Sequence, residues 1–385
     1  MPIPEDARGL FELPEGVTYL NCAYMSPQLR AVREAGEHAI AQGSRPWEIA
    51  PADFFSGAER VRAMFAELVG GDVDGVAIVP AASYGLAVAA ANLPVRPGGE
   101  ILVLEEQFPS NVYVWRELAA REGARLVTVP RPPDHDWTAA VLERLGDNTA
   151  IVSVPNCHWT DGSLVDLVRV GEAAREAGAA LVVDATQSLG AYPLDVGEAG
   201  PDFLVAAGYK WLLGPYSLGF LYAAPHRRDG RPLEHNWITR SEAENFAGLT
   251  DYVEGYAPGA RRYDVGERSN FTLMPMAEAA LAQILEWGVE AIAERSAALT
   301  AEASRLAEAS GMESVPRRRL AGHMIGVRLG PRRPPDLAAR LAAEGVYASV
   351  RGDSLRISPH VYNTASEVER LFGTLSGLLG GAVRR

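Results

Sequence analysis

The feature of this sequence that most constrains its fold is a regular alternation of short apolar runs with longer helix-like stretches. In the first two-thirds of the chain, "TAIVSVP" leads to "LVDLVRVGEAAREAG", and that stretch leads to "ALVVDATQ". Alternation of this kind predicts βαβ units, and therefore a mostly parallel sheet with helices on both faces. A nearly continuous apolar run such as "ALVV" suits a strand that is buried on both sides. We therefore expect an α/β fold whose ligands bind beyond the carboxyl ends of the strands.

The pattern changes after Tyr222, where a looser, aromatic and acidic stretch follows. A long helical stretch is expected from about Met274 to about Ser310, followed by shorter strands with helices between them. These features predict a second, smaller α+β domain. The expected division is an N-terminal segment packing with the small domain (1–40), a large domain (41–264) and a small C-terminal domain (265–385).

The composition describes an ordinary globular protein with room for two domains and a large core. The net charge is −13 and is spread along the chain, and the basic residues form no stripe. Both features argue against nucleic acid as a partner. Cys22 and Cys157 are too few for a disulfide framework, and no zinc spacing is present. The run at 75–95 contains Pro80 and Pro94, so it suits a strand, a loop and a helix better than a membrane span. The start of the sequence lacks the pattern of a signal peptide, and we expect a cytoplasmic protein.

A single lysine stands out within the apolar segment "DFLVAAGYKWLLGPYSLGFLY". Lys210 is the one formal charge between Asp202 and Arg227. One interpretation is a side chain whose stem crosses apolar surface while its ammonium reaches water. The other is a buried lysine, because desolvation favours the neutral amine that a nucleophile needs.

An acid at the end of the preceding strand favours the second interpretation. Asp184 ends the predicted strand "ALVVD", and Lys210 follows the next strand along the chain. One βα unit separates the two residues, so both side chains can face the same crevice. Pyridoxal phosphate requires such a pair, because a lysine amine forms the Schiff base and a carboxylate keeps the pyridine nitrogen protonated. A helix N-cap remains the alternative role for Asp184.

These elements resemble those of a known family. The stretches "VVDATQSLG" and "AAGYKWLLGPYSLGFLY" are similar to the class V aminotransferase family of fold-type I pyridoxal-phosphate enzymes, which includes cysteine desulfurases, kynureninases and epimerases. The resemblance extends from "YLNCAYMSP" to "LRISPHVYNT". It implies the fold-type I PLP-dependent transferase fold, pyridoxal 5′-phosphate as cofactor, and an amino-acid substrate that reacts through an external aldimine.

The resemblance implies roles for several cofactor-binding residues. Lys210 would form the Schiff base and shuttle protons, and Asp184 would bind the pyridine nitrogen. Gln187 would hydrogen-bond the phenolic oxygen of the cofactor, with helix capping as the alternative. Ala82 and Ser83 fall where the family binds phosphate at a helix start, although Ser83 could equally be a plain N-cap.

Other positions match kynureninases more closely. Tyr209 matches a tyrosine that reaches the phosphate, and Phe108 matches an aromatic residue placed against the cofactor ring, with an ordinary core position as the alternative. In "NCHWTDG", one polar residue is expected to touch the cofactor, and three candidates remain open: Asn156, His158 and Thr160. His158 could equally be a satisfied structural histidine.

Two further segments carry residues that the resemblance assigns to the partner subunit and the substrate. "GERSNF" is similar to a segment that crosses to the phosphate of the partner subunit, so Asn270 would act in a homodimer with shared active sites; Glu267 stands where many desulfurases have threonine. Arg356 matches the arginine that binds the substrate carboxylate bidentately. A surface salt bridge is the alternative for any arginine, and it suits Arg351 better.

The sequence narrows the reaction without fixing it. Persulfide-forming desulfurases need a cysteine shortly before the substrate arginine, and "YASVRGDSLRIS" contains none. We expect a transaminase or a side-chain-cleaving lyase. A C–S or β-lyase, a kynureninase-like hydrolase and an epimerase stay open as alternatives, because a shared cofactor site does not fix the substrate. A nicotinamide-dependent dehydrogenase is disfavoured because no Gly-x-Gly-x-x-Gly follows the first strand. A non-catalytic relative is disfavoured by the intact lysine, aspartate and arginine.

Overall fold

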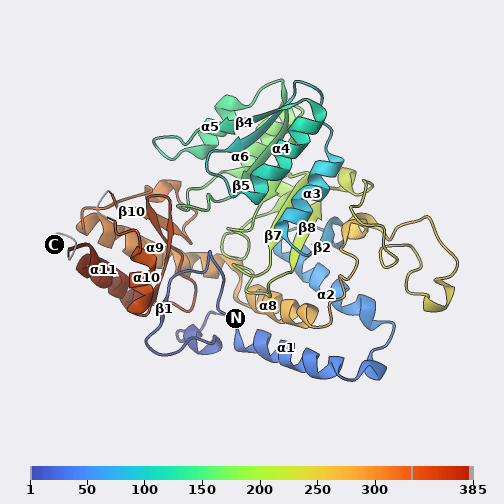
Figure 1. Cartoon of the computed structure of the whole chain (residues 1–385), viewed down its shortest axis with the longest axis horizontal. Coiled ribbons are helices and arrows are strands. Elements are labelled where there is room, and N and C mark those ends of the chain that lie inside the picture. The colour runs from blue at the N-terminus through green and yellow to red at the C-terminus, as the bar shows by residue number, and fades with distance from the viewer. Residues whose placement is uncertain (1, 331–332, 381–385) are drawn as a thin grey trace.

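A computed structural model describes residues 2–330 and 333–380 of the chain and confirms the α/β fold. The large domain contains a seven-stranded sheet with the order β2-β8-β7-β6-β5-β3-β4 (Figure 1). Its strands are β2 (Val76–Val79), β3 (Glu100–Leu104), β4 (Arg125–Val129), β5 (Thr149–Pro155), β6 (Ala180–Asp184), β7 (Phe203–Ala207) and β8 (Gly219–Ala223). All are parallel except β8, which is antiparallel to both neighbours. The connection 208–218 between β7 and β8 contains no helix, and parallel strands need a longer crossover.

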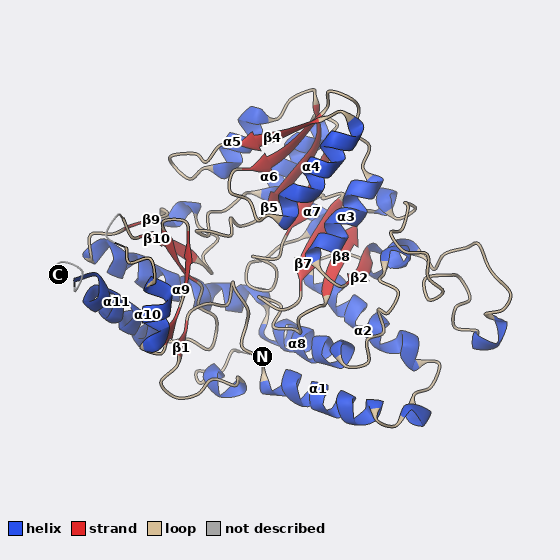
Figure 2. Ribbon diagram, in the orientation of Figure 1, coloured by secondary structure: helices blue, strands red, loops and turns tan. Residues whose placement is uncertain are grey.

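Helices cover both faces of this sheet (Figure 2). One face packs against α3 (Ala82–Asn92) and α4 (Ser110–Glu122). The other face shares a core with α2 (Asp53–Leu68), α5 (Trp137–Arg144), α6 (Leu167–Glu176), α7 (Val196–Ala199) and α8 (Leu273–Trp287). Successive residues of each strand point to opposite faces, so both cores draw apolar side chains from the same strands.

The small domain is built around an antiparallel sheet with the order β12-β13-β10-β9. Its strands are β9 (Glu313–Ser314), β10 (Ile325–Arg328), β12 (Ser349–Arg351) and β13 (Ser354–Ile357), and its helices are α9 (Val289–Ala309), α10 (Leu337–Ala343) and α11 (Ala365–Gly380). Near the N-terminus, β1 (Thr18–Tyr19) pairs in parallel with β11 (Val346–Tyr347), and α1 (Arg30–Gly43) packs against α8. The first forty residues therefore contact both parts of the molecule (Figure 1).

The helical stretch expected from Met274 to Ser310 is two helices, not one. Gly288 separates α8 from α9 with φ 80° and ψ 135°, a backbone conformation that glycine adopts at little cost. Buried residues of α8 lie in the core of the large sheet. In α9, Ile292 near the start still joins that core, whereas Leu299, Ala303 and Ala307 lie in the core of the small domain. The domain boundary expected between residues 264 and 265 thus separates α8 from the core to which it contributes. Residues 1, 331–332 and 381–385, which the expected domains include, lie outside the described residues.

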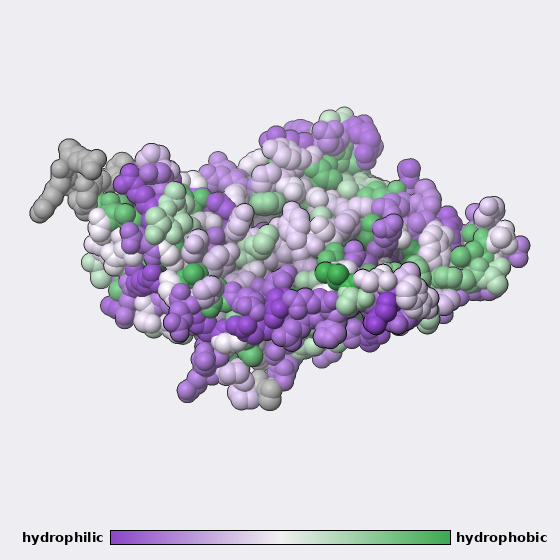
Figure 3. Space-filling model, turned by 60° about the horizontal axis from the view of Figure 1, so that its bottom comes forward, coloured by the Kyte–Doolittle hydropathy of each residue, from purple (hydrophilic) through white to green (hydrophobic). Residues whose placement is uncertain are grey.

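A long connection runs from β8 to α8 and carries several exposed apolar side chains. Trp237, Leu249 and Tyr252 are all more than a third exposed, as are Ile40 and Trp47 near the end of α1. In the face of the molecule that Figure 3 draws, apolar residues gather at the right-hand end, where the connection lies, and hydrophilic residues predominate towards the middle. Contiguous exposed apolar surface often marks an interaction site.

Over residues 2–330 and 333–380, no helix has the length and apolar character needed to cross a membrane. The same residues contain no group of three or more histidine, cysteine or acidic side chains arranged to hold a metal ion.

Candidate active site

A cavity of about 290 Å³ lies beyond the carboxyl ends of β5, β6 and β7. The last residues of these strands, Pro155, Asp184 and Ala207, form part of its wall. The start of α3 and the connection after β7 form further walls. The parallel strands thus deliver their ends to one crevice, as expected for sheets of this type.

Lys210 is buried in this cavity rather than reaching into solvent. Its side chain is 5% exposed, and its Nζ lies 5.3 Å from the ring centroid of Phe108 and 5.5 Å from that of Tyr209. Burial lowers the pKa of Lys210 to about 8, against the opposing influence of Asp184. The amine is therefore far easier to deprotonate than that of an exposed lysine.

Lys210 is also the single lysine in the full sequence. Of the 36 lysine and arginine residues, every other one is arginine. Counting lysines alone would have singled out this position, because a chain with one amine side chain offers one site for imine chemistry.

Asp184 faces the same cavity at the end of β6. It is 8% exposed, and its Oδ1 accepts a hydrogen bond from the N–H of Thr186 at 3.1 Å. Burial raises the pKa of the Asp184 carboxyl, and within the described residues no ion pair joins it to Lys210 or to any other cation. A buried acid without a cationic partner fits a protonated pyridine nitrogen, whose charge would offset the desolvation of the carboxylate.

The start of α3 provides a place for an anion. Ala82 and Ser83 line the cavity, Ala81 before them is extended, and no side chain caps this end of the helix. Free N–H groups and the helix dipole favour a phosphate at such a position. Tyr209 lines the same cavity, with its ring centroid 4.6 Å from that of Tyr216. The acid, the amine and the helix start together fit pyridoxal phosphate.

Gln187 lines the cavity, but its amide already has partners. Its Nε2 donates to the carbonyl oxygen of Ala23 at 3.1 Å, and its Oε1 accepts from Nε1 of Trp211 at 3.0 Å. An amide nitrogen carries two hydrogens, so one N–H remains for a ligand. Its expected bond to the phenolic oxygen of the cofactor remains a prediction.

None of the three candidates in segment 156–160 lines this cavity. Asn156 is buried and donates its amide N–H to a backbone carbonyl. His158 is fully buried and stacks on Trp137, with ring centroids 5.1 Å apart and planes at 10°. Its Nδ1 lies 2.8 Å from Oγ1 of Thr160, and burial lowers its pKa. His158 therefore has the surroundings of a structural histidine.

The residues of this segment that do reach the cavity were not predicted. Cys157 and Trp159 line it, while Thr160 lines a neighbouring cavity. The indole of Trp159 meets the ring of Phe108 edge-on, with centroids 5.4 Å apart. Phe108 is 37% exposed, so it is not an ordinary core aromatic. Alternation along the segment, with Cys157 and Trp159 on one side, was the signal available in the sequence.

Thr186 is a further residue that the sequence reasoning missed. It lines the cavity, and its Oγ1 accepts a hydrogen bond from the N–H of Ala207 at 3.2 Å, which joins the ends of β6 and β7. It stands between the expected aspartate and glutamine, so its position in the motif was the available signal.

Arg356 on β13 is a buried cation that has no carboxylate partner in the described part of the chain. It is 1% exposed, its Nη1 donates to the carbonyl oxygen of Trp159 at 2.9 Å, and its Nε has no partner within the described residues. Burial, together with the nearby charge of Arg351, lowers the pKa of Arg356 to about 9. A buried guanidinium whose charge is not balanced by a neighbouring acid is suited to bind the carboxylate of a ligand.

Asn270 lies on the surface of its own chain, outside the cavity. Its Oδ1 accepts hydrogen bonds from the N–H groups of Thr272 and Leu273, at the start of α8. The expected contact with the phosphate of a partner subunit is not tested by a single chain and remains a prediction.

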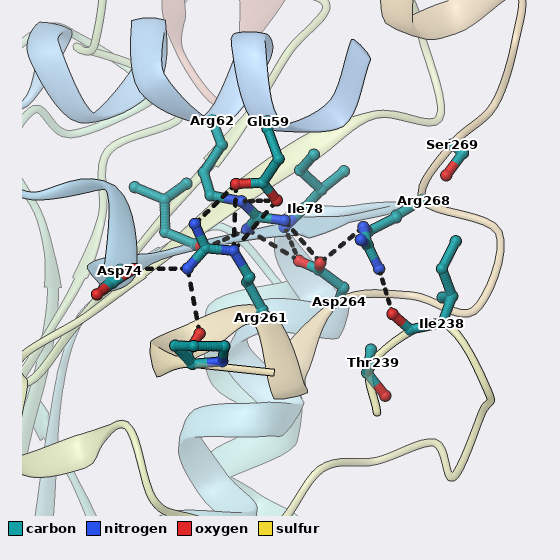
Figure 4. Close-up of polar contacts among 12 residues, drawn as sticks. Glu59, Arg62, Asp74, Ile78, Ile238, Thr239, Arg261, Asp264, Arg268 and Ser269 are labelled. Atoms are coloured by element: carbon teal, nitrogen blue, oxygen red, sulfur yellow. Dashed lines mark hydrogen bonds and ion pairs between the residues drawn. The ribbon is translucent and has the colours of Figure 1, made fainter. Parts of the chain in front are cut away.

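The segment that carries Asn270 is fixed by a buried cluster of charges (Figure 4). Asp264 accepts hydrogen bonds from Arg62 through both carboxylate oxygens, at 2.7 and 3.2 Å, and forms an ion pair with Arg268, whose Nε lies 3.1 Å away. Its Oδ1 also accepts the N–H of Ile78 at 2.7 Å. One carboxylate therefore joins α2, β2 and the start of the segment.

Comparisons with known proteins agree with this arrangement. The sequence profile described as Aminotransferase class-V matches residues 27–371. An uncharacterized aminotransferase, YcbU, of Bacillus subtilis (strain 168) is 29% identical over 95% of each chain, and an isopenicillin N epimerase of Streptomyces clavuligerus is 28% identical over 98% of each. An apo cysteine desulfurase from Thermococcus onnurineus NA1 has the same fold, with a TM-score of 0.86, 22% identity and 99% of each chain covered. As the sequence motifs predicted, the chain belongs to the class V aminotransferase family of pyridoxal-phosphate-dependent enzymes.

Proposed function

We propose that this protein transforms an amino acid at the cavity formed by the ends of β5, β6 and β7, as a transaminase or a side-chain-cleaving lyase. The observation that carries the proposal is the single lysine of the chain, buried near the carboxyl of Asp184, which has no ion-pair partner among the residues that the structure describes. When bound, pyridoxal phosphate supplies an electron sink for bonds at the substrate Cα.

Lys210 holds the cofactor and moves a proton at the substrate Cα. Because its pKa is about 8, about a tenth of the free amine is neutral at pH 7 and about half at pH 8, and the neutral amine acts as a base. Asp184 keeps the ring nitrogen protonated, and the N–H groups at Ala82 and Ser83 bind the phosphate. Arg356 binds the α-carboxylate and so fixes which bond at Cα is broken.

A persulfide-forming desulfurase fits this site poorly. Such an enzyme needs a reactive thiolate, and thiolate character requires a low pKa. Burial raises the pKa of Cys22 to about 12 and raises that of Cys157 as well. Both cysteines are buried, and both are far in sequence from the mobile position expected before Arg356.

Borohydride reduction of the purified protein tests the proposal. The holoenzyme should absorb in the visible range, lose that absorbance on reduction, and yield a pyridoxyl adduct on the one peptide that contains Lys210. Lys210→Ala should lose colour and turnover, and Lys210→Arg is the matched control that keeps the charge without the imine. An adduct elsewhere, or full turnover in Lys210→Ala, would overturn the mechanism.

We further propose a cytoplasmic homodimer with shared active sites. The exposed position of Asn270 and the apolar surface carried by the connection before α8 support the dimer. Two free, buried cysteines suit a reducing compartment. Mixing Lys210→Ala chains with Asn270→Ala chains should restore part of the activity, because one of the two sites is then intact. A chain that sediments as a monomer with full activity would refute the shared site.

A further inference from the structure

A second cavity, of about 660 Å³, lies between the large and the small domain. It shares two wall residues, Gln107 and Trp159, with the cavity that contains Lys210. The two cavities are therefore neighbours that meet at Gln107 and Trp159.

The register of the small sheet places two arginines on the face that meets this region. Ser349 of β12 pairs with Arg356 of β13, so their side chains share a face. Arg351 follows Ser349 by two residues and therefore lies on the same face. The guanidinium carbons of Arg351 and Arg356 lie 5.6 and 6.0 Å from the ring centroid of Trp159.

Most of the cations in the wall of the second cavity already have acidic partners. Arg131 pairs with Glu106 at 2.9 Å and with Asp161 at 2.5 Å. Arg328 lies within 4.0 Å of Glu313 and Asp353.

Arg351 differs from these cations. Among residues 2–330 and 333–380 it has no carboxylate within ion-pair distance, and its Nη1 donates a hydrogen bond to the carbonyl oxygen of Val350 at 2.8 Å. The surface ion pair expected for it from the sequence is therefore absent from the described residues. Half-buried, it lines the second cavity with its charge unmatched.

Resting on the function proposed above, we propose that Arg351 binds a carboxylate on the side chain of the substrate. Arg356 binds the α-carboxylate, and Arg351 binds the second carboxylate on the other side of Trp159. The substrate class is then α-amino acids with an acidic side chain. A planar guanidinium binds a carboxylate through two parallel hydrogen bonds, which an uncharged amide cannot match.

Spectral titration of the cofactor-loaded enzyme with matched pairs of amino acids tests this assignment. Aspartate is compared with asparagine, and glutamate with glutamine, so that each pair differs by one charge. A charge-assisted bond predicts that at least one acidic member binds about 10- to 100-fold more tightly than its amide. Arg351→Met should remove that difference by weakening the acid alone. Arg328→Met is the matched control, because Arg328 lines the same cavity on the same sheet and has carboxylates nearby.

A second probe does not depend on turnover. Glutarate should compete with the acidic amino acid in the wild type, and butyrate, with one carboxylate, should compete far less. The proposal is wrong if acid and amide bind equally to the wild type, if Arg351→Met keeps their ratio, or if the ratio changes with Arg328→Met instead. If any of these results is found with a wild-type enzyme that still has borohydride-sensitive colour, only the role of Arg351 is refuted and the proposed function stands. If the wild-type enzyme has no such colour, the proposed function itself is refuted.

Discussion

The buried carboxylate of Asp264 offers a direct test of how this protein holds the segment that leads to Asn270. Asp264→Asn keeps the shape of the side chain and removes its charge. Arg62 is fully buried and Arg268 nearly so, and both would then lack a compensating anion, apart from the contact of Arg62 with Glu59 at 3.1 Å. We expect the variant to fold with markedly lower stability.

The magnitude follows from the burial. Removing one partner of a buried ion pair costs about 3–5 kcal/mol, because the other charge stays buried. Unfolding entropy of about 2.1 cal/mol/K per residue gives about 0.8 kcal/mol/K for 385 residues. The expected fall in Tm is therefore about 4–6 °C.

Differential scanning calorimetry of the cofactor-free protein measures this shift. Arg121→Met is the control, because Arg121 forms an exposed ion pair with Glu122 and its loss should leave Tm within error. If Asp264→Asn melts within about 1 °C of the wild type, the cluster contributes little and the reasoning from burial fails.

Two further predictions concern pH and packing. Burial lowers the pKa of His323 to about 4, below the unfolded value of 6.5. The neutral, buried side chain therefore contributes fully to the free energy of unfolding above pH 6.5, and this contribution is lost as the pH falls toward 4. Between pH 7 and 5 the expected loss is about 2 kcal/mol of unfolding free energy, measured by urea titration at each pH. His323→Asn should reduce this pH dependence by that amount. An unchanged pH dependence in the variant would contradict the assignment. Gly162 has φ +82°, and a Cβ there would overlap the carbonyl oxygen of Met324. Gly162→Ala should lower the free energy of unfolding by about 2–4 kcal/mol. Gly123→Ala should lower it by only about 1 kcal/mol, because a Cβ at Gly123 bears the backbone cost but makes only an ordinary contact with Pro97, at 3.8 Å. Equal midpoints for the two variants would refute the close approach.

The layout of the large domain could be predicted from the sequence because its signals are local and repeated. Each apolar run followed by a helical stretch specifies a strand and its crossover, and the carboxyl ends of those strands carry Asp184 and, just beyond, Lys210. The antiparallel direction of β8 was not predicted, although the missing helix in the connection 208–218 pointed to it. The break at Gly288 was missed for a similar reason, since one glycine interrupts an otherwise continuous helical pattern.

The cavity itself was predicted less completely than the sheet. Residues at strand ends follow from the alternation, whereas Trp159 reaches the cavity from a loop whose shape depends on contacts with the small domain. The unpaired state of Arg351 depends equally on long-range packing, because it requires knowing which carboxylates lie nearby in space. The sequence places both arginines close together in the chain, but that neither has a carboxylate partner among the described residues follows only from the fold.

The burial of Lys210 has a practical consequence, because it leaves the exterior of the folded chain with guanidinium groups and no side-chain amines. Amine-reactive reagents that spare the N-terminus then have one target, reached through the mouth of the crevice. In the cofactor-free protein, the rate at which such a reagent couples measures how accessible that amine is, and pyridoxal phosphate should slow the coupling in proportion to its occupancy, because its aldehyde would take up the same amine.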